Sequence, residues 1–379
     1  MTGALQGLRV VEIAAKGAVP FCGMLFADFG AEVVLVDRAP IDTEQIVPLT
    51  LRGRRSIAVD LKAPKGSETL LRLIECADVL LEGFRPGVME RLGIGPDECL
   101  GRNPALVYGR MTGWGQDGPL AQTAGHDLNY IAVAGVLAHV GRHGQPPTPP
   151  LNLVGDYGGG AMALAFGVLA ALLERSRSGK GQVVDAAMLD GAALFMTSLW
   201  GMRSGTPAGW NESERGANLY DSGAPFYDVY ETADKKFVAV ATIEVPFFNE
   251  LMRLTGLAAD KFADHYDPVV WPELRKQLTG VFASRTRDDW GVIFAGTDAC
   301  VSPVLTMGEA GAHPHVRDRS TITEYNGTLQ PSPAPRLSRT PGSIQRPSPR
   351  PGEHSDEVLA DWGFSDDEVD ALRELGTVP

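Results

Sequence analysis

Three polar residues stand at predicted boundaries between a loop or strand and a helix, where a side chain can take part in proton transfer. His126 lies in the segment 125–130, at a predicted helix start, and is followed by an aspartate. The positive end of a helix lowers the pKa of an imidazole and keeps more of it neutral, as a general base requires. Considered alone, this pattern is better explained by a polar turn in which the histidine bonds to backbone.

The second candidate is Asp156, which stands beside the three glycines 158–160. These residues directly precede an apolar segment predicted to form a buried helix. An aspartate in this place can cap the helix. A cap does not need three neighbouring glycines, however, and these let a ligand approach the backbone closely. Burial against the apolar helix is expected to raise the pKa of the Asp156 carboxyl.

The third candidate is Glu244, which follows a predicted strand and begins a predicted helix. A single acid in this place commonly complements the helix dipole. Beside a histidine, the same carboxylate would fix the imidazole tautomer and stabilise the imidazolium.

Arginines are concentrated in the first quarter of an acidic chain. The 379 residues carry a formal net charge of -13, which argues against a nucleic-acid or anionic-membrane partner. A local group of guanidinium side chains can still bind phosphate through paired N–H donors. The candidates for an anionic ligand are Arg38, Arg54, Arg55, Arg85 and Arg91.

No cofactor or metal motif accompanies these residues. A β-α-β opening favours a dinucleotide, but the turn at 14–20 lacks the G-x-G-x-x-G pattern that brings backbone close to a pyrophosphate. Segment 178–181 resembles a P-loop only superficially, because it lacks the upstream glycine and the Ser or Thr after the lysine. The histidines and acids show no metal-ligand spacing. We predict no separate cofactor and no metal.

The segments that must position these residues alternate between strand and helix. This alternation predicts an α/β, Rossmann-like large domain with a mainly parallel sheet covered on both faces. The predicted strands are 8–13, 31–37, 56–61, 77–81, 105–110 and 182–187. The predicted helices are 21–29, 65–75, 158–175 and 189–200.

A smaller α+β domain is predicted next, with a loop at 205–218, hairpin strands at 226–231 and 236–242, and a helix at 244–254. Residues 331–351 are rich in proline and are predicted to be irregular. Two short acidic helices, 355–362 and 365–375, end the chain. The predicted domains are 1–200 for the large α/β domain, 201–320 for the small domain, and 321–379 for a segment returning to the large one.

A cytoplasmic protein is predicted, or, in a eukaryote, an organellar one. Residues 1–11 run almost directly into a strand, without a basic-then-apolar signal segment. The longest apolar stretch, 161–173, is shorter than the ~20 residues of a membrane span. Cys22, Cys76 and Cys300 have apolar or small neighbours, which indicates reduced core thiols.

Short motifs along nearly the whole chain resemble class III CoA-transferases. Motifs of the superfamily lie at 5–12, 28–34, 37–38, 54–56, 60–62, 82–88, 112–116 and 179–185. Motifs similar to its α-methylacyl-CoA racemase branch lie at 125–130, 223–227, 243–244 and 297–301. Departures from the usual pattern near the expected acyl pocket occur at Tyr220, Lys235 and Val245.

This resemblance implies an isomerase that inverts 2-methylacyl-CoA thioesters by 1,1-proton transfer through an enolate. His126 and Asp156 match the two proton-transfer groups, Glu244 matches the partner of the histidine, and Asn152 matches a supporting residue. The resemblance also implies an interlocked homodimer. The residues expected to bind the acyl-CoA substrate are Arg38, Val59, Asp60, Leu61, Lys62, Arg85, Arg91, Gly125, Asp127, Leu128, Asn129 and Tyr130.

Two other functions compete with this hypothesis. In a CoA transferase of the same family, the residue matching Asp156 is a nucleophile that forms a mixed anhydride. His126 and Glu244 favour the racemase, since a carboxylate nucleophile needs neither. A non-catalytic CoA-binding protein would be expected to lack all three polar residues, and all three are present.

Overall fold

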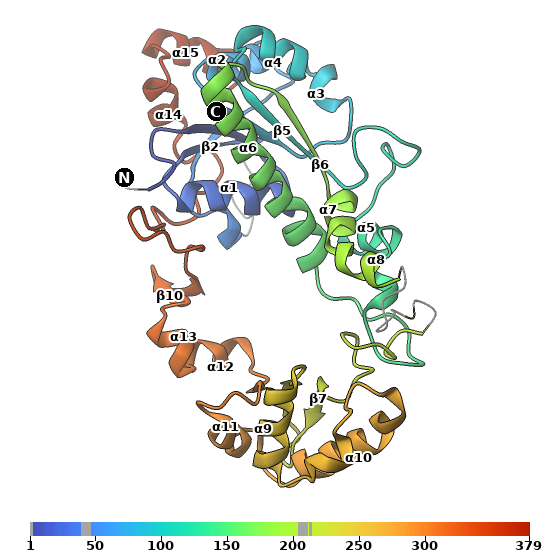
Figure 1. Ribbon diagram of the computed structural model, residues 1–379. Coiled ribbons are helices and arrows are strands. Elements are labelled where there is room, and N and C mark those ends of the chain that lie inside the picture. Colours follow the sequence, from blue (N-terminus) through green and yellow to red (C-terminus); the bar gives the residue numbers. More distant parts are fainter. Residues whose placement is uncertain (1–2, 39–46, 204–210, 212–213) are drawn as a thin grey trace. The chain divides into compact units, whose positions relative to one another are not determined.

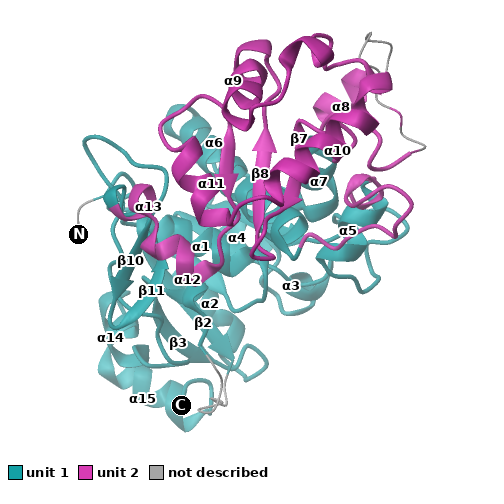
Figure 2. Cartoon of the chain, turned by 90° about the horizontal axis from the view of Figure 1, so that it is seen from below, with its two compact units in different colours: residues 1–134, 151–195, 318–379 teal, residues 135–150, 196–317 magenta. Residues whose placement is uncertain are grey.

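The chain forms two compact units in the computed structural model, which describes residues 3–38, 47–203, 211 and 214–379. The first unit comprises residues 1–134, 151–195 and 318–379, and the second comprises 135–150 and 196–317 (Figure 2). Each unit has a hydrophobic core of its own.

A six-stranded, fully parallel sheet organises the first unit, in the order β3-β2-β1-β4-β5-β6 (Figure 1). The predicted α/β architecture with a mainly parallel sheet is confirmed. From β1 the strands are added toward one edge of the sheet as far as β3, and from β4 they are added toward the other edge. The point between β1 and β4 is therefore the topological switch point, where sheets of this kind bind ligands. The strands are β1 (Arg9–Ile13), β2 (Glu32–Arg38), β3 (Arg55–Val59), β4 (Val79–Glu82), β5 (Val107–Thr112) and β6 (Val183–Ala187).

Helices cover both faces of this sheet because its strands alternate apolar residues between two cores. Val10 contributes to the core beneath α1 and α6, whereas its neighbour Val11 contributes to the core that contains α2, α14 and α15. The last two helices therefore pack near α2, although they end the chain (Figure 1). The helices of this unit are α1 (Ala18–Asp28), α2 (Gly66–Glu75), α3 (Val88–Arg91), α4 (Pro96–Arg102), α5 (Asp127–Val133), α6 (Ala163–Ser178), α7 (Met188–Phe195), α14 (Ser355–Asp361) and α15 (Asp366–Glu374).

The predicted apolar helix differs from its prediction in two respects. It begins earlier, because a π-helical segment, Leu153–Met162, runs directly into α6. It is also not buried all round: Leu164 and Val168 face the core, whereas Phe166 is 76% exposed and Leu173 is 66% exposed. By length and composition alone, the 26 residues 153–178 could cross a membrane. Their inward side packs against the sheet, as expected of a core helix in a soluble protein.

The second unit contains a three-stranded antiparallel sheet, β7 (Tyr227–Glu231), β8 (Phe237–Ala241) and β9 (Val301–Pro303). The predicted hairpin is confirmed, and Lys235 in its turn takes a left-handed φ of 59°. Most of the predicted loop 205–218 falls outside the described residues. The α-helices of this unit are α8 (Thr197–Arg203), α9 (Val245–Thr255), α10 (Trp271–Phe282), α11 (Arg287–Phe294), α12 (Met307–Ala312) and α13 (Pro314–Asp318).

The segment after residue 318 contains a hairpin, β10 (Ile322–Tyr325) and β11 (Thr328–Pro331), followed by irregular structure as far as α14. Buried Arg52 fixes this segment by donating to Gln330 Oε1 and to the Pro331 carbonyl, both at 2.8 Å. The same guanidinium donates to both carboxylate oxygens of Asp28 in α1.

Two of the five candidate phosphate-binding arginines serve the core instead. Arg54 is fully buried, and its Nε and Nη2 donate to Glu12 Oε2 at 2.9 and 2.8 Å. Arg55 binds Glu357 and Asp361 of α14 at 2.9 and 2.6 Å. The sequence-based assignment of Arg54 and Arg55 to an anionic ligand is therefore wrong, because internal carboxylates already occupy their donors.

The four cysteines are free thiols, but not all of them lie in the core. Cys22 and Cys99 are buried, whereas Cys76 and Cys300 are exposed. The prediction of core thiols is thus wrong for Cys76 and Cys300. Cys76 is the C-terminal cap of α2 and faces solvent. Cys300 takes a left-handed φ of 47° in the loop before β9.

Candidate active site

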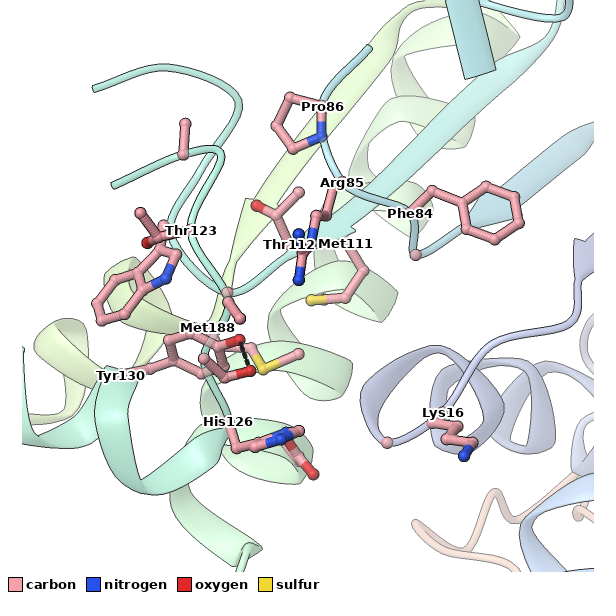
Figure 3. A pocket seen from close by; sticks show the side chains of 18 of the residues that line it. Lys16, Phe84, Arg85, Pro86, Met111, Thr112, Thr123, His126, Tyr130 and Met188 are labelled. Carbon is pink, nitrogen blue, oxygen red and sulfur yellow. Dashed lines mark hydrogen bonds between the residues drawn. The ribbon is translucent and has the colours of Figure 1, made fainter. Parts of the chain in front are cut away.

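A cavity of about 410 Å³ opens at the carboxyl ends of β1, β4 and β5, all in the first unit (Figure 3). This is the place where the strand order reverses, and loops from neighbouring strands diverge there to leave room for a ligand. Its walls carry two candidate proton-transfer groups, His126 and Asp156. The other lining residues are Lys16, Gly17, Val19, Gly83, Phe84, Arg85, Pro86, Met111, Thr112, Gly113, Trp114, Ala121, Thr123, Ala124, Gly125, Tyr130 and Met188.

His126 is the N-terminal cap of α5, as the sequence predicted. Its backbone N–H donates to Asn129 Oδ1 at 3.0 Å, which fixes the first turn of the helix. The imidazole is exposed toward the cavity (Figure 3). It can therefore meet a bound substrate without displacing a neighbouring side chain.

Tyr130 holds the loop that precedes His126. Its phenol donates to the Gly125 carbonyl, and its ring meets Trp114 edge-on at a centroid distance of 4.8 Å. A Cβ at Gly113 would lie 2.0 Å from the Tyr130 ring, so only glycine permits this packing. We infer that Tyr130 positions the histidine through the backbone of residue 125.

Asp156 lies within the π-helical segment rather than at a helix cap. Wide π turns displace side chains from the usual helical rows and occur frequently at functional sites. The glycines beside it serve packing between helices: a Cβ at Gly159 would lie 2.6 Å from the backbone nitrogen of Ala192 in α7. Our expectation that these glycines admit a ligand is therefore wrong at this position.

Burial raises the pKa of the Asp156 carboxyl above its ordinary value. The Asn152 amide opposes this rise by donating to Asp156 Oδ2 at 3.0 Å, whereas the charge of Asp127 adds to it and His126 opposes it. Asp127 also accepts the Asp156 backbone N–H at 2.7 Å, which ties the start of α5 to the π helix. Gly17 contacts the carboxyl from β1's loop, since a Cβ there would lie 3.0 Å from Oδ2.

Other residues expected to bind substrate lie outside the cavity wall. Arg38 ends β2, and the segment 59–62 begins with the last residue of β3, so both stand on the same carboxyl edge of the sheet. Arg91 ends α3, and both Leu128 and Asn129 are exposed on α5. Of the expected CoA-binding residues, Arg85, Gly125 and Tyr130 line the cavity.

Glu244 belongs to the second unit, where it is the exposed N-terminal cap of α9, as predicted. The backbone before it is rigidly held, because His265 Nε2 and the Tyr266 hydroxyl both donate to the Ile243 carbonyl at 2.8 Å. His265 is itself buried and stacks on Phe248 at 4.2 Å. These two hydrogen bonds therefore fix the position of the backbone from which the Glu244 side chain extends at the start of α9.

Sequence reasoning missed several wall residues, including Lys16, Thr112 and Trp114. A signal existed for Lys16: it follows the first strand of an α/β sheet, where ligands usually bind. Thr112 and Trp114 lie in the family motif at 112–116, which was not assigned to the site; the buried indole nitrogen of Trp114 has no hydrogen-bond partner in the described parts of the chain. Over the same residues, no group of three or more His, Cys, Asp or Glu side chains could hold a metal.

Comparison with known proteins identifies the family. The model of CoA-transferase family III matches residues 5–355. The chain belongs to CoA-transferase family III. It is 47% identical to the alpha-methylacyl-CoA racemase of Mus musculus over 96% of this chain and 95% of that protein. It is 46% identical to the alpha-methylacyl-CoA racemase of Homo sapiens over 98% of this chain and 96% of that protein.

The fold also agrees with a solved family structure. A CAIB/BAIF family protein from Brucella suis superposes with a TM-score of 0.82 at 24% identity, covering 96% of this chain and all of that one. This likeness supports the fold. The resemblance inferred from the sequence motifs is thereby confirmed at the level of the family, and the protein is an enzyme of CoA-transferase family III.

Proposed function

We propose that the protein is an α-methylacyl-CoA racemase that interconverts the (2R) and (2S) forms of 2-methylacyl-CoA. The observation that carries this proposal is the presence of His126 and Asp156 in the wall of one cavity. Near full-length identity of 47% to a mouse protein named as such a racemase supports the choice of reaction.

Inversion at carbon requires a base on one face and an acid on the other. Neutral His126 takes the α-proton of one enantiomer while protonated Asp156 delivers a proton to the opposite face; the other enantiomer reverses these roles. The raised pKa of Asp156 suits it to hold a proton that an ordinary aspartate would lose. The enolate oxygen formed between the two steps would meet backbone N–H groups of the first turn of α5.

Glu244 completes this proposal as the partner of the histidine. Its carboxylate would accept the imidazole N–H, fix the tautomer, and stabilise the imidazolium that forms after proton abstraction. We propose that it reaches His126 in an interlocked homodimer, from the small domain of the partner subunit.

An exposed apolar strip supports the homodimer. Phe166 and Leu173 of α6, Leu194 and Phe195 of α7, and Leu153 are each more than half exposed within the first unit. Large apolar side chains exposed in this number on neighbouring helices are typical of a protein interface. The second copy of this chain is the partner we propose, and the acidic net charge gives no support to nucleic acid or an anionic membrane. A cytoplasmic location stays a prediction.

CoA is proposed to lie along the carboxyl edge of the sheet. The adenosine and phosphate part would lie beside Arg38, the segment 59–62 and Arg91, and the pantetheine arm would pass Arg85 into the cavity. CoA belongs to the substrate in this reaction, so no separate cofactor is required.

A CoA transferase with Asp156 as nucleophile is the alternative. One feature favours it: Asp156 accepts a hydrogen bond from the neutral Asn152 amide and lines the cavity, where an acyl group could reach it. The raised pKa of Asp156 favours the racemase over this alternative, because it increases the share of the carboxyl that carries a proton at a given pH, and only the ionised carboxylate is a nucleophile.

The test is incubation of the purified protein with one diastereomer of a 2-methylacyl-CoA in heavy water. α-Deuterium incorporation and the epimer ratio are followed by NMR and chiral chromatography. Exchange with inversion is expected, and it should be lost in His126→Ala and Asp156→Ala but kept in the exposed controls His143→Ala and Asp117→Ala. Absence of exchange, together with a hydroxylamine-trapped acyl-enzyme, would establish the transferase.

A further inference from the structure

The side chain of Asp127 lies behind the wall of the cavity and not in it. Asp127 is the first residue of α5, directly after His126, and it is 5% exposed. Gly125, His126 and Tyr130 line the cavity, whereas Asp127 is not among the lining residues. The Asp127 carboxylate therefore faces the protein interior, and its contacts there indicate its role.

This carboxylate lies against the backbone of the π-helical segment that carries Asp156. Its Oδ2 accepts the Asp156 backbone N–H at 2.7 Å. The approach requires glycine at the preceding position, because a Cβ at Gly155 would lie 2.7 Å from the same Oδ2 and 2.8 Å from its Cγ. Gly155 is itself buried. The absence of a side chain at 155 thus allows the two acidic residues to come close together.

The other carboxylate oxygen of Asp127 is left without a partner. Within the described parts of the chain, this Oδ1 is buried and makes no hydrogen bond. Burying an ionised oxygen without a partner costs free energy. An asparagine would accept the same backbone N–H and would bury no charge. The charge of Asp127 is therefore the feature that needs a function beyond packing.

A charge in this place acts on the Asp156 side chain. Like charges at short distance disfavour each other's ionised form. Asp127 is the member of the pair that stays ionised, because it accepts a backbone N–H and lies in the first turn of a helix. Burial is the largest cause of the raised pKa of the Asp156 carboxyl, and the charge of Asp127 adds to that rise.

Other groups around Asp156 do not replace this effect. The polar or titratable ones are His126 and Tyr130 of α5, Asn152 of the π-helical segment, and Lys16 and Arg85 of the cavity wall. The neighbouring α1, α7 and β5 add the uncharged Val19, Met188, Met111 and Thr112 to the same wall. The Asn152 amide and the charge of His126 both lower the pKa of Asp156 and so oppose Asp127.

We propose that Asp127 is a positioning residue that holds the backbone of Asp156 at the cavity and keeps a proton on the Asp156 carboxyl. Asp127 itself contacts no reacting atom through its side chain. The proposal rests on the proposed function for the use of that proton, but the interaction between the two carboxyls does not depend on any reaction.

The first test is the pH profile of Asp127→Asn, in which an amide oxygen can still accept the Asp156 N–H but the charge is gone. Asp97→Asn is the matched control, because Asp97 also lies in the first turn of a helix of this unit, α4, but is exposed and outside the cavity wall. The rate of α-proton exchange is followed by NMR in heavy water over a range of pH. Thermal melting verifies that both variants fold.

We expect the limb of the kcat/KM profile that reports Asp156 to move to lower pH in Asp127→Asn, because the protonated carboxyl loses a charge that favours it. Asp97→Asn should have the wild-type profile. A limb that stays in place would overturn the proposal, and so would an equal loss of rate at every pH, which is the result of a purely structural role.

The second test does not use the reaction. Urea denaturation compares wild type, Asp156→Asn, Asp127→Asn and the variant with both substitutions. Above pH 3.8, a raised folded pKa makes wild-type stability fall relative to Asp156→Asn until pH passes the folded pKa. This fall should be smaller when the charge of Asp127 is removed from both proteins. An equal fall with and without that charge would overturn the proposal.

Failure of the proposed function gives a different result. In that case the wild-type protein incorporates no α-deuterium, while the four denaturation series still decide whether Asp127 acts on Asp156. If Asp127→Asn does not fold, Asp127→Ser takes its place in both tests, because its hydroxyl is a smaller, uncharged acceptor, and the same outcomes decide.

Discussion

Glu12 and Asp156 are two carboxyls of the same unit, and burial raises the pKa of both. Glu12 is fully buried and bound by Arg54, whereas Asp156 is partly buried, bound by a neutral amide, and open to a cavity. Because Arg54 binds the Glu12 carboxylate inside the core, Glu12 stabilises the packing of the sheet and has no access to a ligand. The hydrogen bond that Asp156 accepts comes from the neutral Asn152 amide, which leaves this carboxyl able to exchange a proton with a ligand in the cavity.

The largest expected effect is on the reaction rate, and it concerns Asp156, the carboxyl that lines the cavity. Asp156→Asn keeps the size of the side chain but removes the acid, so the rate of α-proton exchange should fall about 10²- to 10⁴-fold. Rates measured by NMR in heavy water, together with a melting temperature no lower than that of wild type, would show that the loss is chemical. A rate within threefold of wild type would remove Asp156 from the reaction.

The next effect concerns stability. Arg54→Met leaves Glu12 buried without a cation, so the free energy of unfolding should fall by about 3–5 kcal/mol in urea denaturation. Replacing both partners, in Glu12→Leu with Arg54→Met, should recover most of this loss because no uncompensated charge remains. If the double variant is no more stable than the single one, the ion pair is not the source of the effect.

A pH-dependent difference in stability should distinguish wild type from Asp156→Asn. Below the ordinary aspartate value of 3.8, folded and unfolded chains both hold the proton, and Asp156 contributes nothing. Above 3.8 the unfolded chain releases its proton first, because the folded pKa is raised, so wild-type stability falls relative to the variant until pH passes the folded pKa. Urea denaturation across this range measures the difference, and an opposite slope would contradict a raised pKa.

The smallest expected effect is a shift of the pH profile. Asn152→Ala removes the amide donor that lowers the pKa of Asp156, so that pKa should rise further. The limb of the kcat/KM profile that reports Asp156 should move to higher pH, while the maximum rate changes little. A loss of rate at every pH without a shift would indicate that Asn152 contacts the substrate instead.

Much of the fold could be predicted because its signals are local. Short runs of apolar residues, β-branched in several cases, marked all six strands of the parallel sheet, and polar residues before apolar periodicity marked the starts of α5 and α9. The candidate residues His126 and Glu244 therefore fell at helix caps, as expected. Asp156 was selected because three glycines lie next to it, although the π helix around it has no local sequence signature.

The sequence by itself determined which segments form the alternating strands and helices, which family motifs are present, and which residue types are available for proton transfer. Only the tertiary structure decided which charges face inward and which face a ligand. Arg54 and Arg85 look equivalent in sequence, yet one meets Glu12 across the sheet and the other meets the cavity. The physical reason is that ion pairing depends on contacts between residues far apart in the chain, such as Arg55 with Asp361, and no local pattern encodes them.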